Sequence, residues 1–312
     1  MSPKKQKVVA FGECMIELRT AGHGLMRQSF AGDTLNTCIY LARLADGAYG
    51  VDYATAIGDG DPYSEGMLAA WTDEGIGNGL ALRRQGELPG LYAISVDDTG
   101  ERSFHYWRRD AAVRRYFDAP STPLERQIGD IDLFYVSGIS LAILPPAGRD
   151  RLLAAMAAVK AAGGRVVFDN NYRPKLWASA EEALEVYRRA YALADIALVT
   201  LGDEIEVLGG IGEADAIETI CGYPCPEIVI KRGSAPVLLC LAGKERGEVA
   251  VEPVARVVDT TAAGDSFGAG YLAARLRGMA PTEAAATGSR LAATVIQHPG
   301  AIIPLAAMPK LF

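Results

Sequence analysis

The chain has 312 residues, of which 50% are hydrophobic and 22% are charged, and its formal net charge is −7. This composition excludes a disordered chain, and the length is that of one large domain or two modest ones. The sequence has no run of about 18 uncharged apolar residues and no block of Lys and Arg, so we expect no transmembrane helix and no binding to nucleic acid.

Short β-branched or aromatic runs alternate along the chain with longer runs of helical spacing, which is typical of βαβ units and a mainly parallel sheet. No linker rich in Pro, Gly or Ser interrupts the pattern, which predicts a single main domain over residues 1–312. The predicted strands are 7–11, 53–57, 132–136, 165–169, 196–200, 227–231 and 237–241, and the predicted helices are 34–45, 64–74, 147–162, 180–194, 266–277 and 282–297.

Residues 91–107 break this alternation, because two strand-like runs follow each other with only a short polar turn between them. The pattern predicts a β-hairpin whose second strand has Phe104, Tyr106 and Arg108 on one face. A three-residue loop places Tyr92 opposite Tyr106, whereas a two-residue loop places it on the other face. The hairpin is either a lid over a site or a plain surface hairpin.

Residues 258–276 contain a turn of small residues followed by a helix rich in Ala and Gly. Free N–H groups at a helix start, beside small side chains, form a site for anions. Asp265 lies at this start, where the helix dipole stabilises its charged form. The residues alone leave two hypotheses for Asp265, a helix cap and a catalytic base.

Two further segments carry polar side chains at places where a site is expected. Asp33 and Asn36 lie near the start of the helix predicted at 34–45, as caps or as contacts to a substrate. Asn171 and Arg173 follow the predicted strand 165–169, and ligands of open α/β sheets bind beyond the carboxyl ends of strands. Solvation of a surface loop is the alternative for this second pair.

Several familiar motifs are absent from the sequence. It has no P-loop, no protein-kinase motifs and no dinucleotide-binding glycine fingerprint after the first strand. The three histidines are isolated, and Cys221 and Cys225, the only close pair of cysteines, lack zinc spacing. We therefore expect these two cysteines to be small buried thiols in a reducing compartment. The amino terminus lacks the apolar stretch of a secretory signal, which favours the cytoplasm.

The segment DTTAAGDSFGAGYLA resembles the signature of the ribokinase-like (phosphofructokinase-B-type) sugar kinases, whose usual form is D-T-x-G-A-G-D. GECMIEL, AGDTLN, FDNNYRPKLW and VIKRGSAP occur in the order of that family and span most of the chain. PGLYAISVDDTGERSFHYWR, SGISLAIL and GAIIP more narrowly resemble its members that phosphorylate 2-keto-3-deoxygluconate. The resemblance implies an α/β fold with a central, mostly parallel, Rossmann-like sheet, helices on both of its faces, and a small β-sheet lid from segments around 14–30 and 88–110.

The resemblance also implies the reaction, which is transfer of phosphate from ATP to the primary hydroxyl group of this keto acid. Asp265 would be the general base, the N–H groups of Ala262, Ala263 and Gly264 would form an anion hole, and Mg²⁺ would bridge the phosphates of ATP. The implied substrate contacts are Gly32, Asp33, Asn36, Tyr92, Tyr106, Arg108, Arg173 and Asp265. The implied ATP contacts are Asn171, Arg173, Lys231, Gly233, Ser234, Pro236 and Gly264, and Glu204 would contact Mg²⁺ through water. A homodimer joined through the lid is also implied.

The sequence departs from the family pattern at three positions. Ala31 and Ala262 replace glycines, and Leu201 replaces the Asn of the Asn-x-x-Glu magnesium motif, of which Glu204 remains. Two arginines and two tyrosines at the implied site suit a carboxylate, which favours a keto-acid kinase over a neutral-sugar kinase of the fructokinase or ribokinase type. A non-catalytic sugar or nucleotide sensor and, more weakly, a dinucleotide oxidoreductase are the alternatives from other classes.

Overall fold

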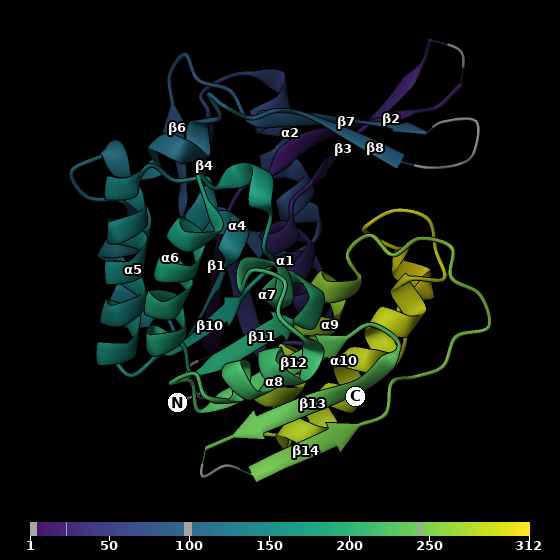
Figure 1. The fold of residues 1–312 in the computed structure, drawn as a ribbon. Coiled ribbons are helices and arrows are strands. Elements are labelled where there is room, and N and C mark those ends of the chain that lie inside the picture. The colour runs from purple at the N-terminus through teal and green to yellow at the C-terminus, as the bar shows by residue number, and fades with distance from the viewer. Residues whose placement is uncertain (1–4, 23, 97–101, 243–244) are drawn as a thin grey trace.

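The computed structural model describes residues 5–312 apart from 23, 97–101 and 243–244. Ten strands of this part of the chain form a central sheet (Figure 1). The described strand pairs in this sheet are parallel except at one edge, where β12 (Glu227–Arg232) and β13 (Ala235–Leu241), and β13 and β14 (Glu245–Val249), pair antiparallel. Their order is β14 (Glu245–Val249), β13 (Ala235–Leu241), β12 (Glu227–Arg232), β11 (Ile196–Thr200), β10 (Arg165–Asp169), β9 (Leu133–Ser137), β1 (Gln6–Phe11), β4 (Tyr49–Gly58) and β5 (Ile76–Gly77), and β6 (Ala81–Arg84) pairs with β4.

Each strand and each helix predicted from the sequence is present, with its ends shifted by a few residues at most. Several short elements were missed, because a few residues do not establish a period: β5, β6, β14, α3 (Pro123–Arg126), α4 (Gly138–Ala142), α7 (Leu201–Val207) and α8 (Glu213–Cys221). The α-helices are α1 (Asp33–Leu44), α2 (Pro62–Asp73), α3 (Pro123–Arg126), α4 (Gly138–Ala142), α5 (Pro146–Ala161), α6 (Ala180–Leu193), α7 (Leu201–Val207), α8 (Glu213–Cys221), α9 (Ala263–Leu276) and α10 (Pro281–Val295). Short 3₁₀ turns are η1 (Ala112–Asp118), η2 (Ile128–Asp130), η3 (Pro174–Leu176) and η4 (Leu305–Ala307).

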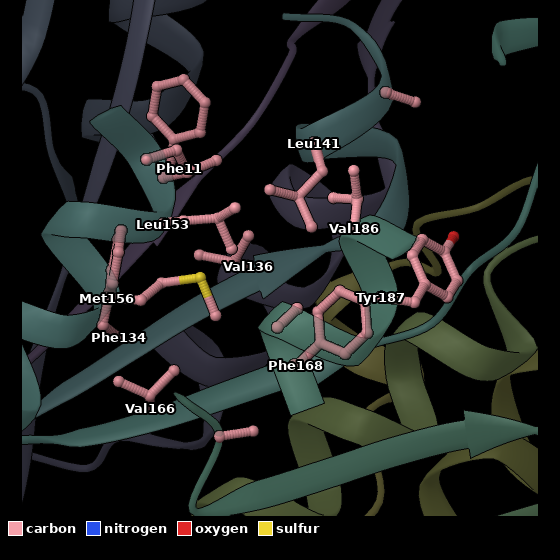
Figure 2. Packing of buried hydrophobic residues seen from close by; sticks show 14 of the residues in the cluster. Phe11, Phe134, Val136, Leu141, Leu153, Met156, Val166, Phe168, Val186 and Tyr187 are labelled. Atoms are coloured by element: carbon pink, nitrogen blue, oxygen red, sulfur yellow. The ribbon is translucent and has the colours of Figure 1, made fainter. Parts of the chain in front are cut away.

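The two faces of the central sheet are covered by different helices, as strand β1 shows. Val9 and Phe11 belong to the hydrophobic cluster under α5 and α6, which Figure 2 shows, whereas Val8 and Ala10 belong to the cluster under α1, α2, α9 and α10. This division follows from the two-residue period of a strand. Full burial of a side chain such as Phe11 contributes about 1.5–3 kcal/mol. The prediction of helices on both faces is confirmed.

A separate sheet contains four of the described strands, in the order β3-β2-β7-β8. They are β2 (Met15–Thr20), β3 (Met26–Ala31), β7 (Gly90–Val96) and β8 (Arg102–Trp107). The predicted small sheet is therefore present, and it extends from one end of the molecule (Figure 1). Tyr92 lies opposite Tyr106, with ring centroids 5.6 Å apart, which is the register that a three-residue loop predicts. The loop itself, at 97–101, lies outside the described residues.

Glycines allow α9 to pack closely on its neighbours, as its sequence predicts. A Cβ atom on Gly270 would lie 2.9 Å from the Cα atom of Gly288 in α10, and one on Gly268 would lie 3.1 Å from Leu198 in β11. Both contacts leave little room for a larger residue. The position of α9 is thereby fixed against the sheet and against α10.

The cysteines require a correction. Cys221 was expected to be a free thiol, but the structure joins it to Cys240 in a disulfide with Cα atoms 5.5 Å apart. Cys225 is free and buried, as expected. No motif indicates this pair, because helix α8 and strand β13 meet only in the folded chain. Among the described helices, none is both long enough and apolar enough to cross a bilayer.

Candidate active site

Asp265 lies at the start of α9, where the sequence places it, but it is not the helix cap. The N-cap is Ala262, in the left-handed region with φ 60°, and Asp265 is the third residue of the helix. Its Oδ2 atom accepts a hydrogen bond from Nδ2 of Asn36 at 2.8 Å. The structure therefore contradicts the cap hypothesis and leaves the carboxyl group available for chemistry.

The environment of Asp265 raises its pKa to about 8. Burial is the largest cause and the neighbouring charge of Asp33 adds to it, whereas the hydrogen bond from Asn36 lowers the pKa. Lys231 also lowers it, and Asp169 raises it. A general base works best when its pKa lies near the working pH, because it can then both accept and release a proton. This carboxyl group meets that requirement.

The residues of the expected anion hole lie at the start of α9. The N–H group of Ala263 donates to the carbonyl of Thr260 at 3.1 Å, so this predicted donor already has a partner. Gly264 and Asp265 lie in the first turn, where a helix provides no carbonyl for its N–H groups. The anion hole expected from Ala262, Ala263 and Gly264 stays a prediction, with the N–H group of Ala263 shared with the carbonyl of Thr260.

The start of α1 brings a second carboxylate beside Asp265. Gly32 is the N-cap of α1, and a Cβ atom there would lie 2.0 Å from the carbonyl oxygen of Glu13, so only glycine fits. Oδ2 of Asp33 accepts from Nδ2 of Asn171 at 2.8 Å, and burial raises the pKa of this carboxyl. Gly32, Asp33, Asn36 and Asn171, all predicted site residues, therefore lie together beside Asp265.

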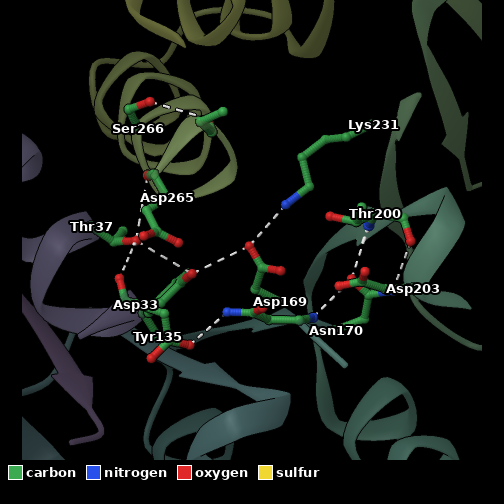
Figure 3. A network of polar contacts seen from close by, with 12 residues as sticks. Asp33, Thr37, Tyr135, Asp169, Asn170, Thr200, Asp203, Lys231, Asp265 and Ser266 are labelled. Carbon is green, nitrogen blue, oxygen red and sulfur yellow. Dashed lines mark hydrogen bonds and ion pairs between the residues drawn. The ribbon is translucent and has the colours of Figure 1, made fainter. Parts of the chain in front are cut away.

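Lys231 enters the site from the end of β12 and pairs with a residue that sequence reasoning missed. Its Nζ atom lies 3.0 Å from Oδ2 of Asp169, and the hydroxyl group of Tyr135 donates to the same oxygen at 3.3 Å (Figure 3). A Cβ atom on Gly264 would lie 3.6 Å from this Nζ. The ammonium group is therefore held next to the start of α9, where an anion would bind.

Glu204 is completely buried and holds another residue that was missed, Asn170. Asn170 donates to its carboxylate at 2.9 Å, and the hydroxyl groups of Tyr191 and Tyr223 each donate at 2.7 Å. Burial raises the pKa of Glu204 against these three hydrogen bonds. The contacts make Glu204 an anchor for Asn170, next to Asn171, and its contact with Mg²⁺ through water stays a prediction.

The predicted acid-binding residues lie where the small sheet meets the central sheet. Arg108 forms an ion pair with the buried carboxylate of Glu13, and its guanidinium lies 5.7 Å from the ring centroid of Tyr106. The charges of Arg108 and Arg173 both lower the pKa of Tyr106, which burial raises, so both cations lie near this phenol. The hydroxyl group of Tyr92 donates to the carboxylate of Glu17, and the contact of Tyr92 with the substrate stays a prediction.

The turn between β12 and β13 contains the remaining predicted ATP contacts. Gly233 has φ 63° in this turn, a conformation that favours glycine, and it and Ser234 are exposed. Pro236 is half-buried at the start of β13. Their contact with ATP stays a prediction, and the turn directly follows Lys231, which does lie at the site.

Every cation among the predicted site residues has a carboxylate partner. Arg108 pairs with Glu13, Arg173 with Asp203 at 3.2 Å, and Lys231 with Asp169. Asp33 and Asp265 form no ion pair with Lys or Arg among the described residues. The missed residues Glu13, Asp169 and Asn170 all follow or end a buried strand, and that position is the signal that would have identified them.

No group of three or more His, Cys, Asp or Glu in the described part of the chain could hold a metal ion alone. Where Mg²⁺ binds together with a nucleotide, phosphate oxygens and water provide most ligands and the protein adds one or two carboxylates. Asp169 and Asp265 are carboxylates of this kind beside the start of α9. The donor set therefore fits Mg²⁺ that arrives with a nucleotide.

Comparison with known proteins gives an independent view of the chain. Residues 5–308 match the family described as pfkB family carbohydrate kinase. A 2-dehydro-3-deoxygluconokinase of Dickeya dadantii (strain 3937) is 47% identical over 308 residues, which cover 97% of this chain and 99% of the relative. A fructokinase of Salmonella typhimurium is 28% identical, over 95% and 92% of the two chains. The structure of a fructokinase from Xylella fastidiosa with bound ATP matches with a TM-score of 0.83 and 22% identity, over 98% of this chain and 96% of that one.

Proposed function

The chain belongs to the pfkB family of carbohydrate kinases, and on this basis we propose that it phosphorylates 2-dehydro-3-deoxygluconate with ATP, giving the 6-phosphate and ADP. The main support for this substrate is the 47% identity to a 2-dehydro-3-deoxygluconokinase over nearly the whole chain, compared with 28% identity to a fructokinase. This compound is the 2-keto-3-deoxygluconate that the sequence pattern implies. Since ATP is a cytoplasmic metabolite, we place the reaction in the cytoplasm.

Asp265 begins the reaction in this proposal. Its carboxylate accepts the proton of the primary hydroxyl group, the hydroxyl oxygen attacks the γ-phosphorus, and the bond to the bridging oxygen of ADP breaks. The hydrogen bond from Asn36 Nδ2, at 2.8 Å, keeps one carboxylate oxygen in place, and in this proposal the other oxygen takes the proton. General-base help of this kind contributes about 10²–10⁴ in rate.

Backbone N–H groups and the ammonium group of Lys231 stabilise the phosphoryl group during its transfer. The N–H groups of Gly264 and Asp265 point from the first turn of α9, and Lys231 lies beside them. Phosphoryl transfer depends mainly on positioning and on charge stabilisation of this type. The cations of the site are already paired with carboxylates, so they compensate only part of the phosphate charge. Mg²⁺, held by ATP and by Asp169, would neutralise the rest.

The acid end of the substrate lies against Tyr106, Arg108 and Arg173 in this proposal. Moving a carboxylate out of water costs free energy unless charged groups donate hydrogen bonds to it, and two guanidinium groups provide such donors. A neutral sugar has no carboxylate that could pair with these guanidinium groups. Tyr92 supports this end indirectly, because it packs against Tyr106 while its hydroxyl group donates to Glu17.

A panel of substrates with Mg-ATP tests the function. The panel contains 2-dehydro-3-deoxygluconate, its galactonate-derived epimer, fructose and ribose, and the release of ADP measures turnover. We expect the highest kcat/KM with one of the two keto-deoxy acids and a 6-phosphate as product. A higher kcat/KM with fructose or ribose would refute the proposal, and binding without any ADP release would indicate a sensor.

The small sheet is the proposed lid and dimer contact. On the face of this sheet away from Tyr106, the Trp107 side chain is 62% exposed, and it lines a groove of about 350 Å³ together with Ile16, Leu18 and Leu91. A second copy of the chain would cover this surface. Light scattering should give the mass of a dimer, and Trp107→Glu should give a monomer; a monomeric parent protein would contradict the proposal.

A further inference from the structure

Glu13 lies in the connection between β1 and β2, where the chain leaves the central sheet for the small sheet. Its side chain is only 2% exposed, and two glycines pack directly against this residue. A Cβ atom on Gly90, the first residue of β7, would lie 2.5 Å from Oε1 of Glu13, and one on Gly32 would lie 2.0 Å from its carbonyl oxygen. Contacts from the small sheet and from the start of α1 therefore fix Glu13.

The guanidinium of Arg108 is the charged partner of Glu13. Nη2 of Arg108 donates to Oε2 of Glu13, and the arginine side chain is 13% exposed. The pair is not bidentate, because neither Oε1 of Glu13 nor Nε of Arg108 has a hydrogen-bond partner among the described residues, although both atoms are buried. Glu13 thus binds the guanidinium through one N–H group of Nη2, and the other N–H groups of Arg108 can donate to a second acceptor.

The held guanidinium faces the proposed acid end of the site. It lies 5.7 Å from the centroid of Tyr106, whose pKa also responds to the charges of Arg173, Glu13 and Asp33. An arginine that is already ordered loses less side-chain entropy when it binds a carboxylate than one that moves freely. The fixed position of Arg108 therefore favours a ligand with a carboxylate at this place.

We propose that Glu13 is the positioning residue of Arg108 and, through it, a determinant of specificity for acidic substrates. This inference rests on the proposed function, and no residue role assigned above includes Glu13. Glu13 does not contact the carboxylate of the substrate, since both carry negative charge. Glu13 acts by keeping the guanidinium of Arg108 in an orientation in which it can donate both to Glu13 and to the carboxylate of the substrate.

A double-mutant cycle tests this inference with Glu13→Leu, Arg108→Leu and the combined variant. We expect each single change to raise KM for the keto acid about tenfold or more, as the loss of a charged hydrogen bond predicts, with kcat within about twofold. The combined variant should have the KM of Arg108→Leu, because Glu13 acts only through Arg108. Glu13→Gln, whose amide oxygen still accepts from Arg108, should recover most of the loss.

A neutral analogue separates positioning from structural damage. For an analogue with a hydroxymethyl group in place of the carboxylate, Glu13→Leu should leave kcat/KM unchanged, whereas a damaged fold would lower it for both compounds. Glu227→Leu is the matched control, because Glu227 pairs with Arg275 at 2.8 Å at the opposite, amino-terminal end of β12. This control should leave both KM values unchanged.

Two results would overturn the role of Glu13. One is an unchanged KM for the keto acid in Glu13→Leu, and the other is an effect that adds fully to that of Arg108→Leu. Thermal unfolding checks that each variant is folded, and Glu13→Ala takes the place of Glu13→Leu in the cycle if the latter does not fold. Failure of the proposed function is distinct, because the parent protein would then not turn over the keto acid at all.

Discussion

The side-chain amide of Asn36 donates to the carboxylate of Asp265 at 2.8 Å, although 229 positions separate the two residues in the chain. The bond joins the first turn of α1 to the first turn of α9. It stabilises the charged form of Asp265, while burial and the charge of Asp33 act against that form. The balance leaves a carboxyl group that exchanges protons near neutral pH, as a base requires.

Asp265→Asn should abolish most activity without loss of fold. The amide oxygen of the new side chain can still accept from Asn36, but it takes no proton at neutral pH. We expect kcat to fall by about 10²–10⁴ and the midpoint of thermal unfolding not to decrease. In the parent protein, kcat/KM should rise with pH up to about 8, the pKa of Asp265. Turnover retained by the folded variant would exclude Asp265 as the base.

The same substitution should change how stability depends on pH. The pKa of Asp265 is about 8 in the folded chain, against an ordinary value of 3.8. The folded state therefore holds a proton that the unfolded state has released, and stability is lost as pH rises from the lower value to the higher. Asp265→Asn removes this loss, so its stability relative to the parent should increase over that range. Urea unfolding at several pH values measures it, and parallel profiles would contradict the pKa.

Lys231→Met should destabilise the protein and weaken catalysis for separate reasons. The change leaves the buried carboxylate of Asp169 without its cation, which costs about 3–5 kcal/mol in the free energy of unfolding. Adding Asp169→Asn should restore much of this stability but not the activity, because the cation beside Gly264 and the proposed carboxylate ligand of Mg²⁺ are then both missing. Urea unfolding and steady-state kinetics measure the two effects. Activity that returns together with stability would remove Lys231 from the site.

Glu204→Leu should be strongly destabilising because three donors lose their common acceptor. Asn170, Tyr191 and Tyr223 all donate to this carboxylate, and each buried donor left unpaired costs about 1–3 kcal/mol. We expect the free energy of unfolding to fall by about 3 kcal/mol or more. Glu204→Gln, which keeps an acceptor oxygen, should lose less. Equal losses in the two variants would show that the hydrogen bonds are not the reason.

Much of the site could be predicted because its residues follow the ends of strands or begin helices. Asp33, Asn171 and Asp265 are at such places, and the structure brings them together as the resemblance implies. Glu13 and Asp169 lie in the segments GECMIEL and FDNNYRPKLW, but they were missed because each is a single acidic residue in or after an apolar run. Their importance comes from the cations that they face, and those lie far away in the sequence.

The alternating periods of the sequence by themselves determined the main strands and helices and the hairpin at 91–107, because burial of one face imposes those periods locally. Only the tertiary structure decided which charges meet. It pairs Arg108 with Glu13 and Lys231 with Asp169, and it places Asp33 next to Asp265 to raise the pKa of the base. The physical reason is that electrostatic and hydrogen-bond energies depend on distance in space, which the order of residues along the chain does not contain.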